Sequence, residues 1–430
     1  MTEKMTNQNN LKVVDLFAGA GGFGLGFHLA GYDVEFSLEI DDWAVDTLKY
    51  NNPSMIVTKD DIRNYNTLAE IRSVYSGSPD IIIGGPPCQG FSIAGPAQKD
   101  PKDPRNSLFQ NFAKWVELLE PKMFVMENVK GLLSRHNAKG EKVIDIIQKT
   151  FVDLGYDVEV WLLNAAEYGV PQIRERILVV GNRLGIKRIG MPPKTHSLSN
   201  GKSNGHLPPA ITLWDAISDL PPLESGCGEE EQPYTLKTEN NYQQFLHGNQ
   251  KILFNHVAMR HSKRLVERFK HINWGESSAD VPEEHRAHSR NGNGEISEKV
   301  YDQNNRRLYP HKPSHTIAAA FYANFIHPFQ HRNLTAREGA RIQSFPDWYK
   351  FLGKKTIPSH KLLEREGRLD ELHLCQYNQI GNAIPPLLAK SVAEYLEKLL
   401  CPQTLSTALT SNKNKILLPK NTQIRPVKVY

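Results

Sequence analysis

The feature that most constrains the fold is a run of three isoleucines, Ile81 to Ile83, followed at once by two glycines, two prolines and Cys88. An apolar β-branched run without alternation is typical of a strand covered on both faces, as in a parallel sheet. The glycines permit unusual backbone angles, and the prolines fix theirs. Because ligands bind at the carboxyl ends of the strands in open α/β sheets, we expect Cys88 to lie where chemistry occurs.

A glycine-rich turn marks a second strand end. Leu11 to Phe17 predicts a strand, and Gly19 to Gly24 then leads into a helix with the spacing G-x-G-x-x-G. The glycines let a ligand approach the backbone, and the start of the helix offers unpaired N–H groups. This pattern alone fits a dinucleotide-binding oxidoreductase as well as a protein that binds another nucleoside cofactor.

Two side chains after the next predicted strand suit a nucleoside. This strand, Val34 to Leu38, ends at Glu39, and Trp43 follows four residues later. A carboxylate at this position can accept from both ribose hydroxyls. An indole ring offers a flat face to a purine. We therefore expect Glu39 and Trp43 to bind the nucleoside.

An acid and two arginines extend the predicted site. The strand Lys122 to Met126 delivers Glu127 to the same sheet edge as Cys88. Arg174 and Arg176 alternate on an extended segment, so their side chains point the same way and could bind a pyrimidine carbonyl or a phosphate. Ordinary salt bridging is an equally weighted alternative for Arg174.

The length and the distribution of elements predict two domains. At 430 residues the chain exceeds what one core usually supports. We predict a catalytic and cofactor-binding domain at 11–185, completed by 376–400, and a smaller irregular domain at 186–330, where strand and helix patterns fade. Residues 331–375 are expected to form a hinge and an insertion, and 401–430 a basic, disordered tail.

The composition argues against several other classes of protein. No apolar run is long enough to span a membrane, and the polar start lacks the apolar core of a signal peptide, so we expect a cytoplasmic protein. The four cysteines are far apart without a C-x-x-C pair, and the histidines are irregularly spaced, so we expect neither disulfides nor a metal site.

Positive charge is concentrated in one segment. The net charge of +5 permits a polyanionic partner, and residues 251–270 contain six basic residues against Glu267 alone. Arg260, Lys263 and Arg264 lie in this segment and are candidates for phosphate contacts. A solvated face is the alternative explanation for the same charges.

Several motifs, in this order, resemble those of the C5-cytosine DNA methyltransferases. They are DLFAGAGG (15–22), PPCQ (86–89), ENV (127–129), QIRER (172–176), REGARIQSFP (337–346) and QIGNAIPP (379–386). The resemblance spans about Val13 to Leu400. It implies an α/β fold, namely a doubly wound, Rossmann-like S-adenosylmethionine-dependent methyltransferase domain with a smaller target-recognition domain at 186–330.

The resemblance also implies roles for individual residues. Catalysis is expected to involve Cys88, Glu127, Arg174 and Arg176. The residues expected to bind S-adenosylmethionine are Asp15, Phe17, Ala18, Gly19, Gly21, Gly22, Glu39, Trp43, Asp61, Ile62, Pro87, Leu108 and Asn382. The residues expected to contact DNA are Gln89, Ser92, Arg105, Arg260, Lys263, Arg264 and Thr316.

The chemistry that the resemblance implies begins with a thiolate. Cys88 would add to carbon 6 of a flipped-out cytosine, Glu127 would bind ring N3, and carbon 5 would then take the methyl group. By resemblance we expect a monomer on duplex DNA, paired with a restriction endonuclease, without a metal or a membrane. Two alternatives remain open: a transfer-RNA cytosine methyltransferase of the same fold, and a non-catalytic DNA-binding regulator.

Overall fold

The fold is described from a computed structural model. The structure describes residues 11–87, 108–137, 139–198, 207–288, 295–297, 302 and 304–401. The predicted site residues Cys88, Gln89, Ser92 and Arg105 lie outside these residues, as does the predicted tail beyond Cys401.

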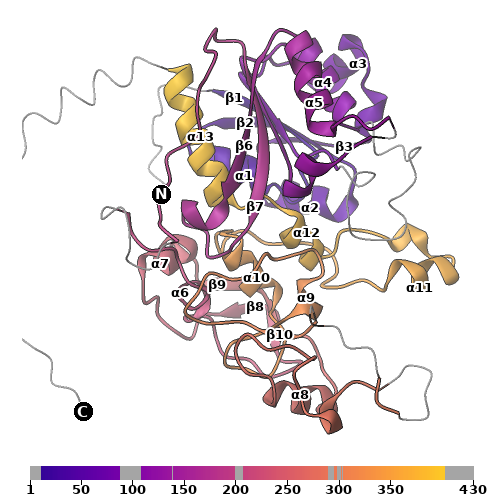
Figure 1. Cartoon of the computed structure of the whole chain (residues 1–430), viewed down its shortest axis with the longest axis vertical. Coiled ribbons are helices and arrows are strands. Elements are labelled where there is room, and N and C mark those ends of the chain that lie inside the picture. The colour runs from indigo at the N-terminus through magenta and orange to yellow at the C-terminus, as the bar shows by residue number, and fades with distance from the viewer. Residues whose placement is uncertain are drawn as a thin grey trace, which may run out of the picture.

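A seven-stranded sheet forms the centre of the molecule (Figure 1). Its strands are β1 (Lys12–Leu16), β2 (Asp33–Glu39), β3 (Ile56–Lys59), β4 (Ile81–Gly84), β5 (Met123–Val129), β6 (Asp157–Asn164) and β7 (Glu175–Asn182). The order is β3-β2-β1-β4-β5-β7-β6, and β7 runs antiparallel to both neighbours. The strand order reverses between β1 and β4, so their carboxyl ends open a crevice. This topology confirms the predicted doubly wound, Rossmann-like α/β fold.

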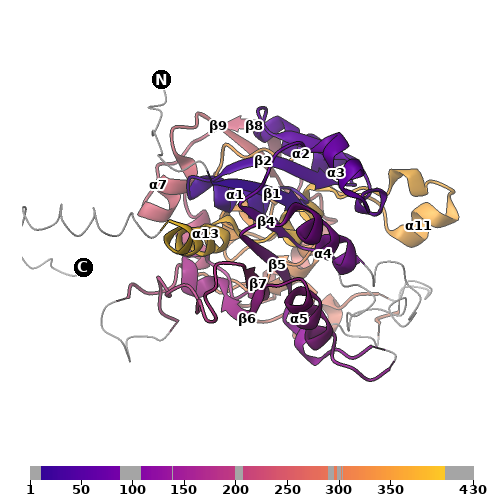
Figure 2. The same ribbon diagram turned by 90° about the horizontal axis from the view of Figure 1, so that it is seen from above.

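Helices cover both faces of this sheet (Figures 1 and 2). They are α1 (Gly22–Leu29), α2 (Asp42–Asn51), α3 (Leu68–Val74), α4 (Leu108–Leu119), α5 (Val143–Asp153) and α13 (Pro386–Leu400). Ile82 packs in one core cluster with Phe112 of α4, whereas Ile81 and Ile83 pack in the other with Leu388 of α13. All three isoleucines are fully buried, which explains why their run shows no alternation.

The described elements between Leu213 and Ile342 are short and form a second region, which includes one fully buried helix. They are α6 (Leu213–Ile217), β8 (Gly228–Pro233), α7 (Asn241–His247), β9 (Ile252–Val257), α8 (Lys263–Lys270), β10 (Arg306–Arg307), α9 (Phe321–Asn324), β11 (Phe325–Ile326) and α10 (Ala336–Ile342). Every residue of α10 is buried. The boundary at 185/186 stays a prediction.

Charged side chains in the interior bind α10 to its surroundings. Arg341 Nε donates to Asp347 Oδ1 at 3.0 Å and Nη2 donates to Oδ2 at 2.6 Å. The same guanidinium also pairs with Asp219, which lies just after α6. All three side chains are almost completely buried. Burial opposes ionisation of Asp347, but the charge and hydrogen bonds of Arg341, together with Arg337 and Tyr234, outweigh it and lower the pKa of this carboxyl.

The remaining described elements are short helices. Two helices follow the buried network, α11 (His360–Arg365) and α12 (Gln376–Asn382). Short 3₁₀ helices are η1 (Ile62–Asn64), η5 (Lys130–Ser134), η6 (Ala165–Tyr168), η7 (Glu283–His285) and η8 (Leu369–Glu371). No helix in the described part of the chain is long and apolar enough to cross a membrane.

Candidate active site

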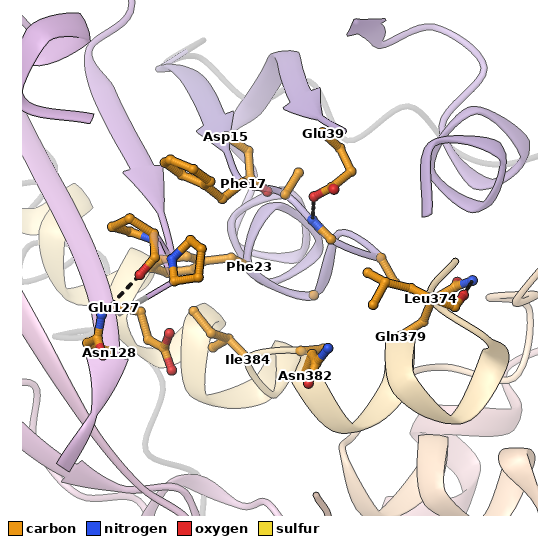
Figure 3. A pocket seen from close by; sticks show the side chains of 18 of the residues that line it. Asp15, Phe17, Phe23, Glu39, Glu127, Asn128, Leu374, Gln379, Asn382 and Ile384 are labelled. Carbon is orange, nitrogen blue, oxygen red and sulfur yellow. Dashed lines mark hydrogen bonds between the residues drawn. The ribbon is translucent and has the colours of Figure 1, made fainter. Parts of the chain in front are cut away.

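A cavity of about 390 Å³ opens at the carboxyl ends of β1, β2, β4 and β5 (Figure 3). This volume lies within the usual range for small-molecule sites. The lining residues are Asp15, Phe17, Ala18, Gly19, Ala20, Gly22, Phe23, Glu39, Ile40, Gly85, Pro86, Pro87, Glu127, Asn128, Val129, Leu374, Gln379, Asn382, Ala383 and Ile384. The cavity therefore joins three predicted motifs, the glycine turn, the Pro-Pro segment and the Glu127 strand end, with the chain before α13.

The glycine turn leaves room for a ligand at one position only. Gly19 has a φ of 55°, and nothing lies within 4 Å of the place where a Cβ would be. At Gly22, by contrast, a Cβ would lie 2.4 Å from the carbonyl oxygen of Ile384. Gly22 therefore permits close packing, whereas the open side of Gly19 permits the approach of a ligand.

Glu39 is fixed by the backbone. Its Oε2 accepts from the N–H of Gly19 at 2.7 Å, and its Oε1 accepts from the N–H groups of Ile40 and Asp41 at 2.8 and 2.9 Å. Burial raises the pKa of Glu39, although these three hydrogen bonds oppose the rise. Each carboxylate oxygen can accept more than one hydrogen bond, so the fixed carboxylate can still receive hydroxyl donors.

Asp15 is the second acid in the wall of the cavity. Its Oδ2 accepts from the N–H of Gly24 at 3.1 Å, while Oδ1 is buried without a hydrogen-bond partner among the described residues. Burial raises the pKa of Asp15 to about 8, although the bond from Gly24 opposes this. A buried polar atom without a partner costs free energy, so this oxygen is suited to a polar ligand group or water.

Glu127 lies at the other end of the cavity. Its Oε1 is 2.8 Å from Arg176 Nε, and a Cβ on Gly85 would lie 3.2 Å from its Oε2. Burial raises the pKa of Glu127, although the charges of Arg176 and Arg174 oppose the rise. The carboxyl group is therefore closer to its protonated form at neutral pH than an exposed glutamate.

Asn128 fixes the backbone that leads to Cys88. Its Nδ2 donates to the carbonyl oxygen of Pro86 at 3.1 Å, and its Oδ1 accepts from the N–H of Val129 at 2.9 Å. The end of β5 is thus hydrogen-bonded to the segment after β4. Pro87, the last described residue of this segment, lines the cavity, and Cys88 follows it directly in the sequence.

Arg174 contacts backbone carbonyls in this structure. Nη1 donates to the carbonyl oxygen of Ile317 at 2.7 Å, and Nη2 donates to those of Gly381 and Ala383 at 3.0 Å each. The side chain is fully buried. Among the described residues it forms no salt bridge, and its guanidinium is not exposed to bind a pyrimidine carbonyl or a phosphate. Arg176 alone of the two arginines reaches Glu127.

Some predicted cofactor residues do not line the cavity. They are Gly21, Trp43, Asp61, Ile62 and Leu108. Trp43 packs against His373, with 5.0 Å between the ring centroids, and Asp61 pairs with Arg63. The residue in the lining after Glu39 is Ile40, which is 60% exposed. Ile40 is not among the expected residues, because the indole of Trp43, three positions further on, is the more conspicuous candidate for a purine contact.

The described DNA candidates differ in their surroundings. Thr316 Oγ1 donates to the carbonyl oxygen of Ile173 at 2.7 Å, and Ile173 directly precedes Arg174 in the sequence. Arg264 pairs with His288 and donates to the Arg286 carbonyl, whereas Lys263 has no polar partner among the described residues. Among all the residues that the structure describes, no group of three or more His, Cys, Asp or Glu side chains could bind a metal ion.

Comparison with known proteins agrees with this geometry. A family model described as C-5 cytosine-specific DNA methylase matches residues 11–398. Type II methyltransferase M.DdeI of Desulfomicrobium norvegicum is 47% identical over 387 residues, covering 89% of this chain and 88% of the relative. Type II methyltransferase M1.HphI of Haemophilus parahaemolyticus is 35% identical over 391 residues, covering 91% and 87%.

Solved structures agree as well. An Escherichia coli prophage protein assigned as a DNA modification methyltransferase superposes with a TM-score of 0.66 at 26% identity, covering 91% of this chain and 99% of that protein. A Spodoptera frugiperda DNMT2 variant has a TM-score of 0.50 at 16% identity, with coverage of 90% and 99%, and shows the fold alone. The chain therefore belongs to the C5-cytosine-specific DNA methyltransferases, and it is an enzyme of the type II restriction-modification kind.

Proposed function

We propose that the cavity binds S-adenosylmethionine, with Glu39 accepting from the ribose hydroxyls and the open side of Gly19 facing the ligand. The unpartnered Oδ1 of Asp15 and the side chain of Asn382 would contact polar groups of the same molecule. The donor and acceptor set therefore fits this cofactor. When bound, it supplies an electrophilic methyl group on a sulfonium sulfur.

The chain's own residues would then activate the cytosine. The Cys88 thiolate forms a bond to carbon 6, and the electrons of the 5,6 double bond move toward carbon 5 as Glu127 protonates N3. Carbon 5 takes the methyl group and then loses its proton to a base. The double bond re-forms as the thiolate leaves, and Glu127 regains the N3 proton. The raised pKa of Glu127 supports the first of these proton transfers, because more of the acid form is then present.

The substrate base must leave the duplex to reach this cavity. Flipping a nucleotide costs a few kcal/mol, which contacts to the phosphates must offset. Arg260, Lys263 and Thr316 are proposed phosphate contacts, and Gln89, Ser92 and Arg105 are proposed contacts near the flipped base. We propose that a monomer acts in the bacterial cytoplasm and protects DNA from a partner endonuclease.

One observation supports this proposal most strongly: Glu127, Glu39 and the Gly19 turn line a single cavity. The test is to incubate the protein with S-adenosylmethionine and plasmid DNA and to locate 5-methylcytosine by bisulfite sequencing. We expect methylation within one recurring sequence and loss of cleavage by an endonuclease that recognises it. Methylation of transfer RNA but not of duplex DNA would contradict the assignment of the substrate.

Gly85→Ala is expected to lower kcat about tenfold while leaving DNA affinity unchanged, since small misplacements of catalytic groups lower rates strongly. The new Cβ would lie 3.2 Å from Glu127 Oε2, so the carboxyl group must move by a few tenths of an ångström. Single-turnover methylation and DNA titration measure the two quantities. Gly131→Ala is the matched control, because nothing lies within 4 Å of its Cβ position. Equal rates for both variants would show that the exact place of Glu127 is unimportant.

A further inference from the structure

A buried tyrosine that follows α10 contacts the glycine turn. Tyr349 is fully buried, and its hydroxyl donates to the main-chain carbonyl oxygen of Ala20 at 2.6 Å. Ala20 lines the cavity, whereas Tyr349 is not among the lining residues. Tyr349 therefore holds a wall of the candidate site from outside the cavity, although the two residues are 329 positions apart in the sequence.

This hydrogen bond fixes the peptide group between Ala20 and Gly21. Gly21 has a φ of 78°, in the left-handed region, and its N–H donates to the carbonyl oxygen of Ala18 at 2.8 Å. The N–H of this peptide group is thus bound within the turn, and its carbonyl oxygen is bound by Tyr349. Because glycine tolerates many backbone angles, the peptide group could rotate at little steric cost if one of these bonds were lost.

The tyrosine hydroxyl also packs against the turn. A Cβ on Gly21 would lie 2.8 Å from Tyr349 Oη and 2.6 Å from Leu48 Cδ2. Gly19, by contrast, is open at its Cβ position. One glycine of the turn therefore makes room for the proposed ligand, and the other makes room for the tyrosine.

The main chain of Tyr349 is bound to the second region. Its carbonyl oxygen accepts from Arg337 Nη2 at 2.7 Å, and Nε of the same guanidinium donates to the carbonyl oxygen of Phe254 in β9 at 2.8 Å. Arg337 is fully buried in α10, and α10 and β9 lie side by side (Figure 1). Two elements of the second region therefore help to set the position of the tyrosine.

The next three residues of the chain bind α2 and β9 in alternation. The N–H groups of Lys350 and Leu352 each donate to a side-chain oxygen of α2 at 2.9 Å. Between them, the N–H of Phe351 donates to Asn255 Oδ1 of β9 at 2.9 Å. We name residues 349–352 the bridging segment, because it connects the glycine turn and α2 to the second region.

We propose that Tyr349 is a positioning residue for methyl transfer: its hydroxyl holds the glycine turn in the form that receives the cofactor, and the bridging segment connects that form to the second region. The proposal rests on the proposed function, because the turn belongs to the proposed cofactor site. Without the hydroxyl, the peptide group after Ala20 would populate other orientations. The apparent affinity for the cofactor would then fall in proportion to the fraction of molecules whose turn is receptive.

The experiment removes only the hydroxyl, with Tyr349→Phe in the full-length protein. We expect the KM for S-adenosylmethionine to rise about fivefold, the order of effect of one lost hydrogen bond. Since bound cofactor restores the receptive turn, kcat at saturating cofactor and the KM for duplex DNA should stay within about twofold of the wild type.

Tyr242→Phe is the matched control. The Tyr242 hydroxyl is also buried and donates to a main-chain carbonyl oxygen, that of Arg341, at 2.6 Å. Both variants should lower the melting temperature without ligands to a similar degree, because each leaves a buried carbonyl oxygen without its donor. Tyr242→Phe should nevertheless keep the wild-type KM for S-adenosylmethionine, which separates positioning of the turn from general stability.

Hydrogen exchange locates the effect in the chain. Deuterium uptake by peptides that cover residues 17–25 should increase in Tyr349→Phe without cofactor, and added S-adenosylmethionine should return it to the wild-type level. An unchanged KM in Tyr349→Phe, an equal rise in Tyr242→Phe, or unchanged exchange at the turn would each overturn the inference. Failure of the wild type itself to bind S-adenosylmethionine would instead refute the proposed function, and the inference with it.

Discussion

Cys88→Ser is expected to abolish methyl transfer and to prevent covalent capture of DNA that contains 5-fluorocytosine. With fluorine at carbon 5, addition and methylation can proceed, but the step that removes a proton cannot, so wild-type enzyme and DNA stay joined. A serine hydroxyl is a far weaker nucleophile than a thiolate at neutral pH. The measurement is a denaturing gel of protein incubated with fluorinated duplex and S-adenosylmethionine.

Cys227→Ser is the matched control, since it removes an exposed free thiol elsewhere in the chain. It should form the adduct as the wild type does. Cys88→Ser should still bind the same duplex, which shows that the variant is folded. A shifted band that persists in Cys88→Ser, or a peptide adduct that maps to Cys227, Cys375 or Cys401, would mean that another cysteine is the nucleophile.

Arg341→Met is expected to lower the free energy of unfolding by about 3–5 kcal/mol, because removing one partner leaves uncompensated buried charge. Methionine retains the unbranched apolar stem of the side chain but leaves Asp219 and Asp347 without their shared cation. Denaturant unfolding followed by fluorescence measures the loss. Arg365→Met, a change at an exposed arginine of α11, should alter the value by less than about 0.5 kcal/mol. Similar losses in both variants would contradict the importance of the buried network.

The pair Arg341 and Asp347 also makes the free energy of unfolding depend on pH. Because Arg341 lowers the pKa of Asp347, the stabilisation is complete above the ordinary range of an aspartate and is lost as pH falls through the lowered pKa. The pKa of Asp219 shifts in the opposite direction, because burial outweighs the effect of Arg341 and raises it. Asp219 therefore stabilises the fold as pH falls. Acid destabilisation below about pH 4 should therefore be smaller in Arg341→Met than in the wild type.

The sequence predicted best what depends on local backbone chemistry. Ile81 to Ile83, the glycine turn and the position of Glu127 could be inferred because strand burial and turn geometry leave a direct mark on neighbouring residues. Contacts between distant segments produce no local sequence pattern from which they could be predicted. Arg174 could not be predicted to bind carbonyls 143 and more residues away, because any residue there carries a carbonyl group.

The differences between the expected residues and the lining of the cavity have a similar origin. Trp43 was favoured for its chemistry, but position along α2 decides which side chains reach the cavity, and Ile40 is nearer the strand end. Leu374 is a leucine in a segment without periodicity, so nothing in the sequence identifies it. His256 and His327 are buried and hydrogen-bonded within the second region, which irregular spacing alone could not reveal.

The contacts of Arg174 bear on how such enzymes change during evolution. Its guanidinium donates to the main-chain oxygens of Ile317, Gly381 and Ala383, so these hydrogen bonds do not depend on the side chains of those residues. Substitutions at Ile317 or Ala383 therefore leave these acceptors in place, because every residue carries a main-chain carbonyl group. The connection that Arg174 makes between these distant segments is thereby preserved while the side chains around it change.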